Sequence, residues 1–241
     1  MIQRIDVHSH LLPNVDDGCR SVEESIACAK RMVGAGYTHS FCTPHIWPTL
    51  DNAFGRTQNR VAELQKALDE AGVPLILMPG GEMHIRADFC GLSAEDLVTY
   101  NNAGRYALFD FWTHSLPDYF GPCIRHLQKS GIQPILAHPE RIEAIQSDPG
   151  VVDDFPRIGL WMQCNLECLG EDRPTIRRRL AEKWLQEDRY FLLGSDLHQL
   201  AGVDVRLRGL DRAIQLVGEE KVWELTSSNP QKLMQPASSM Q

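Results

Sequence analysis

Short apolar segments alternate with longer amphipathic segments along almost the whole chain. The short ones have the length and composition of buried β-strands, and the longer ones repeat apolar residues at helical spacing. We predict seven strands, at Ile5–His8, Ser40–Thr43, Leu75–Met78, Tyr106–Phe111, Pro134–Ala137, Leu160–Asn165 and Tyr190–Gly194. We predict helices at Ser21–Val33, Arg56–Glu70, Tyr119–Gln128, Pro174–Gln186 and Asp204–Val217. Such alternation is typical of parallel strands joined by crossover helices.

The number of repeats and the chain length favour a barrel over an open sheet. Seven predicted strands that alternate with helical segments in 241 residues fit a distorted TIM-like (β/α)7 barrel, since α/β barrels often reach about 250 residues as one domain. No linker rich in Gly, Ser or Pro divides the sequence, so residues 1–241 are expected to form a single domain. The 43% hydrophobic and 23% charged residues are ordinary for a globular protein and argue against a disordered chain.

Charge and hydropathy narrow the range of partners. The formal net charge of −8 argues against general nucleic-acid binding, which needs a basic face. No apolar run approaches the ~18 residues that span a bilayer, and the N-terminus has no apolar signal-peptide core. We therefore expect a cytoplasmic protein without membrane insertion. The seven cysteines lack any CxxC spacing, which favours buried free thiols; a redox or metal pair at Cys164 and Cys168 is the alternative.

The candidate chemistry lies where the predicted strands end. Nearly every strand ends in, or is followed by, residues of metal-binding type: Asp6-Val-His8-Ser-His10, Thr43-Pro-His45, Gly81-Glu82, Asp110 with His114 four residues on, His138-Pro-Glu140-Arg141 and Ser195-Asp196-Leu-His198. The carboxyl ends of barrel strands share one face, where active sites lie, and imidazole with carboxylate suits Mn, Fe or Zn. A single histidine at a strand end is more often a structural residue than a metal ligand. The prediction of a metal site therefore depends on the repetition of such residues at successive strand ends. His39, His84 and His126 fall outside the pattern and are expected to be surface or structural residues.

Taken in order, these motifs resemble the PHP (polymerase and histidinol phosphatase) superfamily. Within it, the stretch HSHLLPNVDDGCRSVEESI and the motif His138-Pro-Glu-Arg141 are similar to the CpsB/CapB/YwqE branch. The members of that branch are bacterial manganese-dependent tyrosine-protein phosphatases of capsule and exopolysaccharide operons. The resemblance extends from Ile5 to about Leu233. It implies a PHP fold that holds three divalent metal ions, with manganese expected and iron, cobalt or zinc as alternatives.

The resemblance also implies roles for individual residues. Nine side chains match metal ligands by position: His8, His10, Glu82 and Asp196 for a first ion, Glu82, Asp110 and His138 for a second, and Asp17, His45 and His198 for a third. Arg141 and Arg206 match the phosphate-binding arginines of the family, with Arg208 as a second candidate for the latter.

One position departs from the family pattern. The family usually has Glu where this chain has Asp110, and the aspartate side chain is one methylene shorter. Asp110 still offers a suitable oxygen ligand, but His114 lies four residues beyond it and could complete the second metal shell instead. Both alternatives stay open from the sequence.

The chemistry implied by the resemblance is hydrolysis of a phosphate monoester. Paired cations lower the pKa of a bridging water toward 7 and neutralise phosphoryl oxygens, so direct metal-hydroxide attack is expected. They would also offset the repulsion among Asp17, Glu82, Asp110 and Asp196 in one cleft. No cysteine has an arginine six residues later, so the Cys-x5-Arg loop of cysteine phosphatases is absent. The implied substrate is a phosphotyrosine protein, with a bacterial tyrosine-kinase tail among the candidates.

Three rival functions remain at this stage. The first is another PHP-type phosphoesterase, such as a histidinol-phosphate phosphatase. The second is a nonenzymatic, metal-stabilised regulator of polysaccharide assembly, which only the departure at Asp110 supports. The third, a urease-type amidohydrolase, is disfavoured because no predicted strand end offers a lysine for carbamylation.

Overall fold

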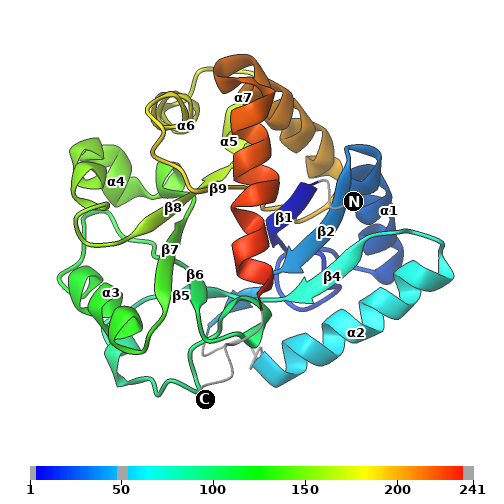
Figure 1. The fold of residues 1–241 in the computed structure, drawn as a ribbon, viewed down its shortest axis with the longest axis horizontal. Helices are drawn as coiled ribbons and strands as arrows, with labels where there is room; N and C mark the ends of the chain where they lie inside the picture. Colours follow the sequence, from blue (N-terminus) through cyan, green and yellow to red (C-terminus); the bar gives the residue numbers. More distant parts are fainter. Residues whose placement is uncertain (1–3, 48–53, 236–241) are drawn as a thin grey trace.

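The computed structural model describes residues 4–47 and 54–235, drawn in Figure 1. Within these residues the strands are β1 (Arg4–Ser9), β2 (Tyr37–Cys42), β3 (His45–Ile46), β4 (Ile76–Pro79), β5 (Glu82–His84), β6 (Tyr106–Asp110), β7 (Gln133–Ala137), β8 (Trp161–Asn165) and β9 (Leu192–Gly194). Their order is β1-β2-β4 in one sheet and β3-β5-β6-β7-β8-β9 in the other, and neighbouring strands run parallel.

The two sheets form one curled wall, because two of the predicted strands are bent rather than interrupted. β2 continues into β3 across Thr43 and Pro44, and β4 continues into β5 across Gly80 and Gly81. A Cβ atom on Gly81 would lie 2.7 Å from Cγ1 of Ile46, so a larger residue here would force the side chain of Ile46 to move. A parallel bridge between Ser9 and Leu197 brings the chain after β9 back to β1. The expected distorted TIM-like barrel is confirmed, and β3 and β5 are the short strands that the sequence did not predict.

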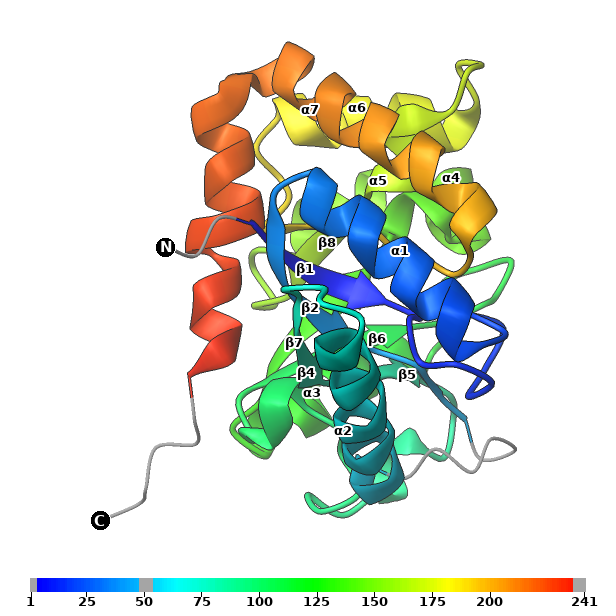
Figure 2. The same ribbon diagram turned by 90° about the vertical axis from the view of Figure 1, so that its right-hand side faces the viewer.

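Helices surround the curled sheet (Figures 1 and 2). They are α1 (Val22–Gly34), α2 (Phe54–Glu70), α3 (Phe120–Lys129), α4 (Glu143–Ser147), α5 (Leu166–Gly170), α6 (Ile176–Gln186) and α7 (Val203–Trp223). The helix α1 begins where the Ser21 side chain accepts a hydrogen bond from the backbone N–H of Glu24. The sequence missed α4 and α5, since five residues are too few to show a helical period.

The last helix is longer than predicted and packs closely against α5. We expected it to stop at Val217, but α7 bends at Gly218, where φ is +83°, and continues to Trp223. Its first half crosses α5 at very close range. A Cβ atom on Gly209 would lie 1.8 Å from the carbonyl oxygen of Leu166, so the absence of a side chain at Gly209 permits the crossing. This close crossing sets the position of Arg206, which lies on α7 three residues earlier.

The apolar core has two parts that correspond to the two faces of the sheet. Phe109 and Leu136 belong to a large cluster that also contains helix residues such as Leu127. Leu108 and Ile135 are their neighbours along β6 and β7 and belong to a smaller, separate cluster. Because successive side chains of a strand point to opposite faces, the smaller cluster lines the concave side of the curled sheet. Among the described residues, no helix has both the length and the apolar composition that crossing a membrane requires.

Candidate metal centre

The carboxyl ends of the strands bring all nine predicted ligand side chains into one cluster. Their ligand atoms form four groups within which every pair lies within 4.8 Å: His10, Asp17, His45 and His198; His8, His10 and Glu82; His8, His138 and Asp196; and His45, Glu82 and Asp110. Neighbouring groups share members, so the cluster is continuous. Most of these side chains are buried, whereas the carboxylate of Asp17 is 69% exposed and marks the open side.

The carboxylate of Glu82 is at the centre of this cluster. Its Oε1 atom lies 2.9 Å from Nε2 of His138, and its Oε2 atom lies 3.3 Å from Nε2 of His8 and 3.1 Å from Nδ1 of His45. Within the described part of the chain neither oxygen has a partner aligned for a hydrogen bond. Buried carboxylate oxygens are normally hydrogen-bonded. Oxygen and nitrogen lone pairs that converge in this way fit a divalent cation, so the residues present suit the implied metals.

The pKa shifts in the cluster are also consistent with a cation site. Burial alone would raise the pKa of Glu82, but the charges of His8 and His138 outweigh it and hold the pKa of Glu82 well below its usual range. Burial would lower the pKa of His10, but Asp16 raises that pKa well above its usual value. Without metal, protons on the imidazoles therefore balance the carboxylates. A divalent cation would replace those protons, because metal ligands must be deprotonated.

Two further residues, which the sequence did not single out, orient the first histidines. Nδ1 of His10 lies 2.7 Å from Oδ2 of Asp16, and Nδ1 of His8 lies 2.9 Å from Oε1 of Gln163. Each contact leaves Nε2 facing Glu82 and Asp196. Partners of this kind fix the tautomer and ring orientation of metal-binding histidines. Gln163 carried one available signal, since it is a polar residue inside the apolar strand β8.

We expect replacement of Asp16 by asparagine to weaken metal binding by about 10–100-fold, the usual effect of losing such an orienting partner. Asp16 also accepts backbone hydrogen bonds from Gly18 and His45, each at 3.0 Å, so the change also loosens the loop beside the cluster. Calorimetric titration of the metal-free variant with Mn²⁺ measures the effect. Asp172→Asn, which removes the same charge from a side chain 86% exposed, is the control. Equal affinities in the two variants would contradict the role given to Asp16.

Two of the predicted ligands occupy backbone conformations that are unusual for residues with a side chain. His138 has φ of +33° and Asp196 has φ of +51°, both in the left-handed region. The Asp196 turn is held from both sides: Asp6 accepts hydrogen bonds from the backbone N–H and the hydroxyl of Ser195, and Asn165 donates to Oδ2 of Asp196 at 2.7 Å. Conformations of this kind persist where the surroundings impose them and concentrate at functional sites.

The arginines matched to phosphate binding have different surroundings. Arg141 pairs with the carboxylate of Asp196, and its side chain is 26% exposed at the edge of the cluster. Arg206 is buried, and its guanidinium donates to the backbone carbonyls of Ser195 and Asp196. Arg208 points elsewhere and pairs with Asp172 on the surface. Arg206 thus supports the turn that carries Asp196, and its direct contact with phosphate stays a prediction.

The structure separates the two candidates for the second metal shell. Asp110 is fully buried and belongs to the group with Glu82 and His45. Its Oδ1 atom lies 2.8 Å from Nδ1 of His84, and the indole N–H of Trp112 donates to Oδ2. The side chain of His114 is 90% exposed, pairs with Glu143 at 2.8 Å and belongs to none of the four ligand groups of the described chain. The geometry therefore favours Asp110.

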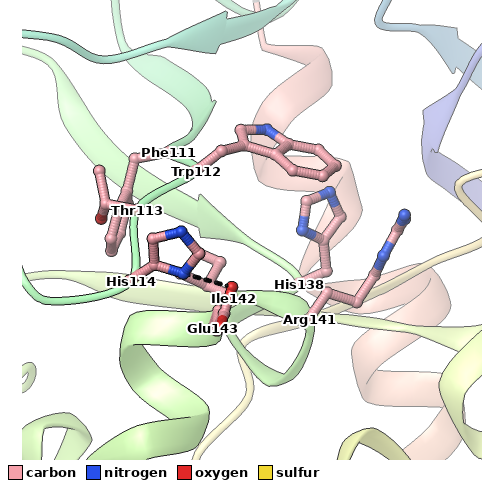
Figure 3. A pocket seen from close by; sticks show the side chains of 8 residues that line it. All are labelled: Phe111, Trp112, Thr113, His114, His138, Arg141, Ile142 and Glu143. Carbon is pink, nitrogen blue, oxygen red and sulfur yellow. Dashed lines mark ion pairs between the residues drawn. The ribbon is translucent and has the colours of Figure 1, made fainter.

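A cavity of about 350 Å³ opens beside the cluster (Figure 3). Its lining residues come from the segment after β6 and from the segment after β7: Phe111, Trp112, Thr113, His114, His138, Arg141, Ile142 and Glu143. Figure 3 shows His138 and Arg141 side by side on one wall, with His114 across the cavity from them. Access to the cluster is therefore available from a cavity with largely apolar and aromatic walls.

Comparisons with known proteins give matches over nearly the whole chain. The sequence profile of the family described as "Capsular polysaccharide synthesis, CpsB/CapC" matches residues 4–235. Tyrosine-protein phosphatase CpsB of Streptococcus pneumoniae is 27% identical over 245 residues, which cover 95% of this chain and 98% of the relative. Tyrosine-protein phosphatase YwqE of Bacillus subtilis (strain 168) is 31% identical over 150 residues, or 61% of this chain and 59% of the relative.

Solved structures support the fold. A chain from the crystal structures of YwqE from Bacillus subtilis and CpsB from Streptococcus pneumoniae, described as unique metal-dependent tyrosine phosphatases, aligns with a TM-score of 0.87 and 24% identity. The alignment covers 97% of this chain and 95% of that one. The phosphotriesterase homology protein of Escherichia coli, solved with phosphate in its active site, aligns with a TM-score of 0.62 and 12% identity, covering 97% of this chain and 99% of that one.

Proposed function

Because the chain belongs to the CpsB/CapC family of capsular polysaccharide synthesis, we propose that it is a metal-dependent phosphatase that hydrolyses phosphotyrosine in proteins. The observation that carries the proposal is the buried cluster of imidazoles and carboxylates around Glu82, beside an open cavity. Family relatives named tyrosine-protein phosphatases support the choice of substrate. On the family resemblance we extend the proposal to the phosphorylated tail of a bacterial tyrosine kinase as the substrate protein.

We propose that the cluster holds three divalent ions, with manganese as the expected metal. The nine converging side chains described above would be their ligands. Bound cations would supply a water activated toward attack and would neutralise charge on the phosphoryl oxygens. The protein itself holds the donors in place: Gln163 fixes the ring of His8, Asp16 fixes the ring of His10, and Asn165 holds the carboxylate of Asp196.

Arg141 is proposed to bind the phosphate group of the substrate. It lies on the wall that the cavity shares with the cluster, next to His138. Burial would lower its pKa, but the neighbouring Asp196 raises the pKa above its ordinary value, so the guanidinium stays charged. The planar guanidinium can donate two parallel hydrogen bonds to phosphoryl oxygens. The phenolate of tyrosine, with a reference pKa near 10, also leaves as an anion more readily than an alkoxide, so the reaction depends less on a general acid.

Hydrolysis assays with the chelator-treated chain test the proposed function. We expect a phosphotyrosine peptide to be hydrolysed after addition of Mn²⁺ and not before, and to be preferred over both histidinol phosphate and a phosphoserine peptide of the same sequence. Preference for histidinol phosphate would favour the rival PHP-type phosphoesterase. Absence of turnover with every divalent cation tried, despite stoichiometric metal binding, would favour the nonenzymatic regulator.

A further inference from the structure

We infer that the cavity beside the metal cluster is an aryl pocket, in which Trp112 determines the preference for an aromatic phosphate ester. The inference rests on the proposed function, because it assigns the ring of the phosphotyrosyl side chain to this cavity. It is argued from the apolar wall of the cavity and from the orientation of one indole ring, which donates a hydrogen bond to Asp110 of the cluster.

The composition of the wall suits a flat apolar group. Phe111 and Ile142 are buried residues that reach the cavity, and Trp112 lines it with a side chain that is well exposed. At about 350 Å³, the cavity lies in the range of small-molecule sites. Aromatic rings pack against one another in offset or edge-to-face arrangements that add to simple burial. A phenyl ring therefore gains contacts here that the short side chain of phosphoserine cannot make.

One hydrogen bond orients the exposed indole of Trp112. Its N–H donates to Oδ2 of the buried Asp110, so its single polar group is already satisfied at the cluster. Trp112 as a residue is 61% exposed. Among the described residues that line the cavity, none covers the apolar face of its ring. An aromatic surface oriented by a hydrogen bond binds a ring at a lower entropic cost than a freely rotating one, because part of its ordering is already in place.

The cavity wall lies next to the proposed phosphate site, so it would contact the ester group of a bound substrate. His138 and Arg141 line the cavity, and they also contact Glu82 and Asp196 of the cluster. A phosphate bound at Arg141 would therefore direct its ester group into the cavity toward Trp112. In this arrangement metal ions held by the ligand cluster would serve any phosphate monoester, and the wall would select those with an aryl group.

The test compares two phosphonates that cannot be hydrolysed, so it does not depend on turnover. Phenylphosphonate and methylphosphonate share the charged group and differ in the ring, and calorimetry on the Mn²⁺-loaded chain gives both dissociation constants. We expect the wild-type chain to prefer phenylphosphonate, and Trp112→Ala to reduce that preference about tenfold. Trp112→Phe, which keeps a ring but loses the N–H, should retain the preference within about threefold.

The pair of variants separates selection from support of the metal site. The alanine and phenylalanine variants both lack the hydrogen bond to Asp110. Any effect of that loss on the metal site is therefore the same in the two variants, and it changes the affinities for the two phosphonates equally. Trp223→Ala, at the end of α7 and also exposed, is the matched control and should leave the preference unchanged. Equal preferences in Trp112→Ala and the wild type, or equal losses in the alanine and phenylalanine variants, would overturn the inference. If phosphotyrosine turnover fails while the phosphonate preference holds, the proposed function is wrong and the aryl pocket stands.

Discussion

Replacing Glu82 by glutamine is expected to lower kcat/KM for a phosphotyrosine peptide at least about 10³-fold. The Lewis-acid effect of bound ions is worth several kcal/mol, and about 1.4 kcal/mol corresponds to a factor of ten in rate. Glu82 faces the imidazoles of His8, His45 and His138 at 2.9–3.3 Å. Glutamine removes the negative charge and places an amide N–H₂ group, which cannot bind a cation, among these nitrogen atoms. Metal analysis by mass spectrometry should show at least one ion fewer per chain.

A second buried glutamate provides the matched control for this variant. Glu140 follows β7, and it accepts hydrogen bonds from the backbone of Asn165 and the hydroxyl of Tyr190, but it belongs to none of the ligand groups of the described chain. Burial raises the pKa of Glu140, so a neutral glutamine is a mild replacement there. We expect Glu140→Gln to keep its full metal content. Loss of metal and activity in both variants alike would show that Glu82 acts through the packing rather than through ligation.

The position of the ligand cluster could be predicted from the sequence because topology alone determines it. The residues His8, Glu82, His138 and Asp196 are far apart in the chain, but each lies at or just beyond the carboxyl end of a parallel strand: β1 for His8, β4 for Glu82, β7 for His138 and β9 for Asp196. Parallel strand ends meet on one face whatever the helices between them look like. That argument needs only strand identity and order, which the apolar segments supply. It does not need the bends after β2 and β4, which the sequence analysis missed.

The residues around the ligands could not be predicted in the same way. Asp16 is adjacent to Asp17 in the sequence, and only the fold shows that one binds His10 while the other is exposed near His45 and His198. The roles of the arginines depend on side-chain direction, which residue type does not determine. The guanidinium of Arg206 donates its hydrogen bonds to backbone carbonyls, because the close crossing of α5 and α7 places it next to the turn after β9.

The metal-free chain is expected to become less stable as pH rises from 6 to 9, whereas the metal-loaded chain becomes more stable. Burial lowers the pKa of His8 and His10, but neighbouring carboxylates reverse the shift, so both pKa values lie above the ordinary value of 6.5 in the folded chain. A raised pKa gives stabilisation that is complete below about pH 6.5 and is lost as pH rises through the folded value. The lowered pKa of Glu82 gives stabilisation that is lost only in strong acid, outside this range.

Bound cations reverse this dependence because they need deprotonated imidazoles, so metal binding strengthens as pH rises. An ion present at 100 times its Kd adds about 2.7 kcal/mol to the free energy of unfolding. For a chain of this size that raises Tm by roughly 5–10 °C. Scanning calorimetry at pH 6, 7 and 8, with chelator or with excess Mn²⁺, should therefore give slopes of opposite sign. In Glu82→Gln the two slopes should converge. Parallel slopes in the wild-type chain would mean that the clustered histidines do not exchange protons for metal, and the proposed centre would have to be abandoned.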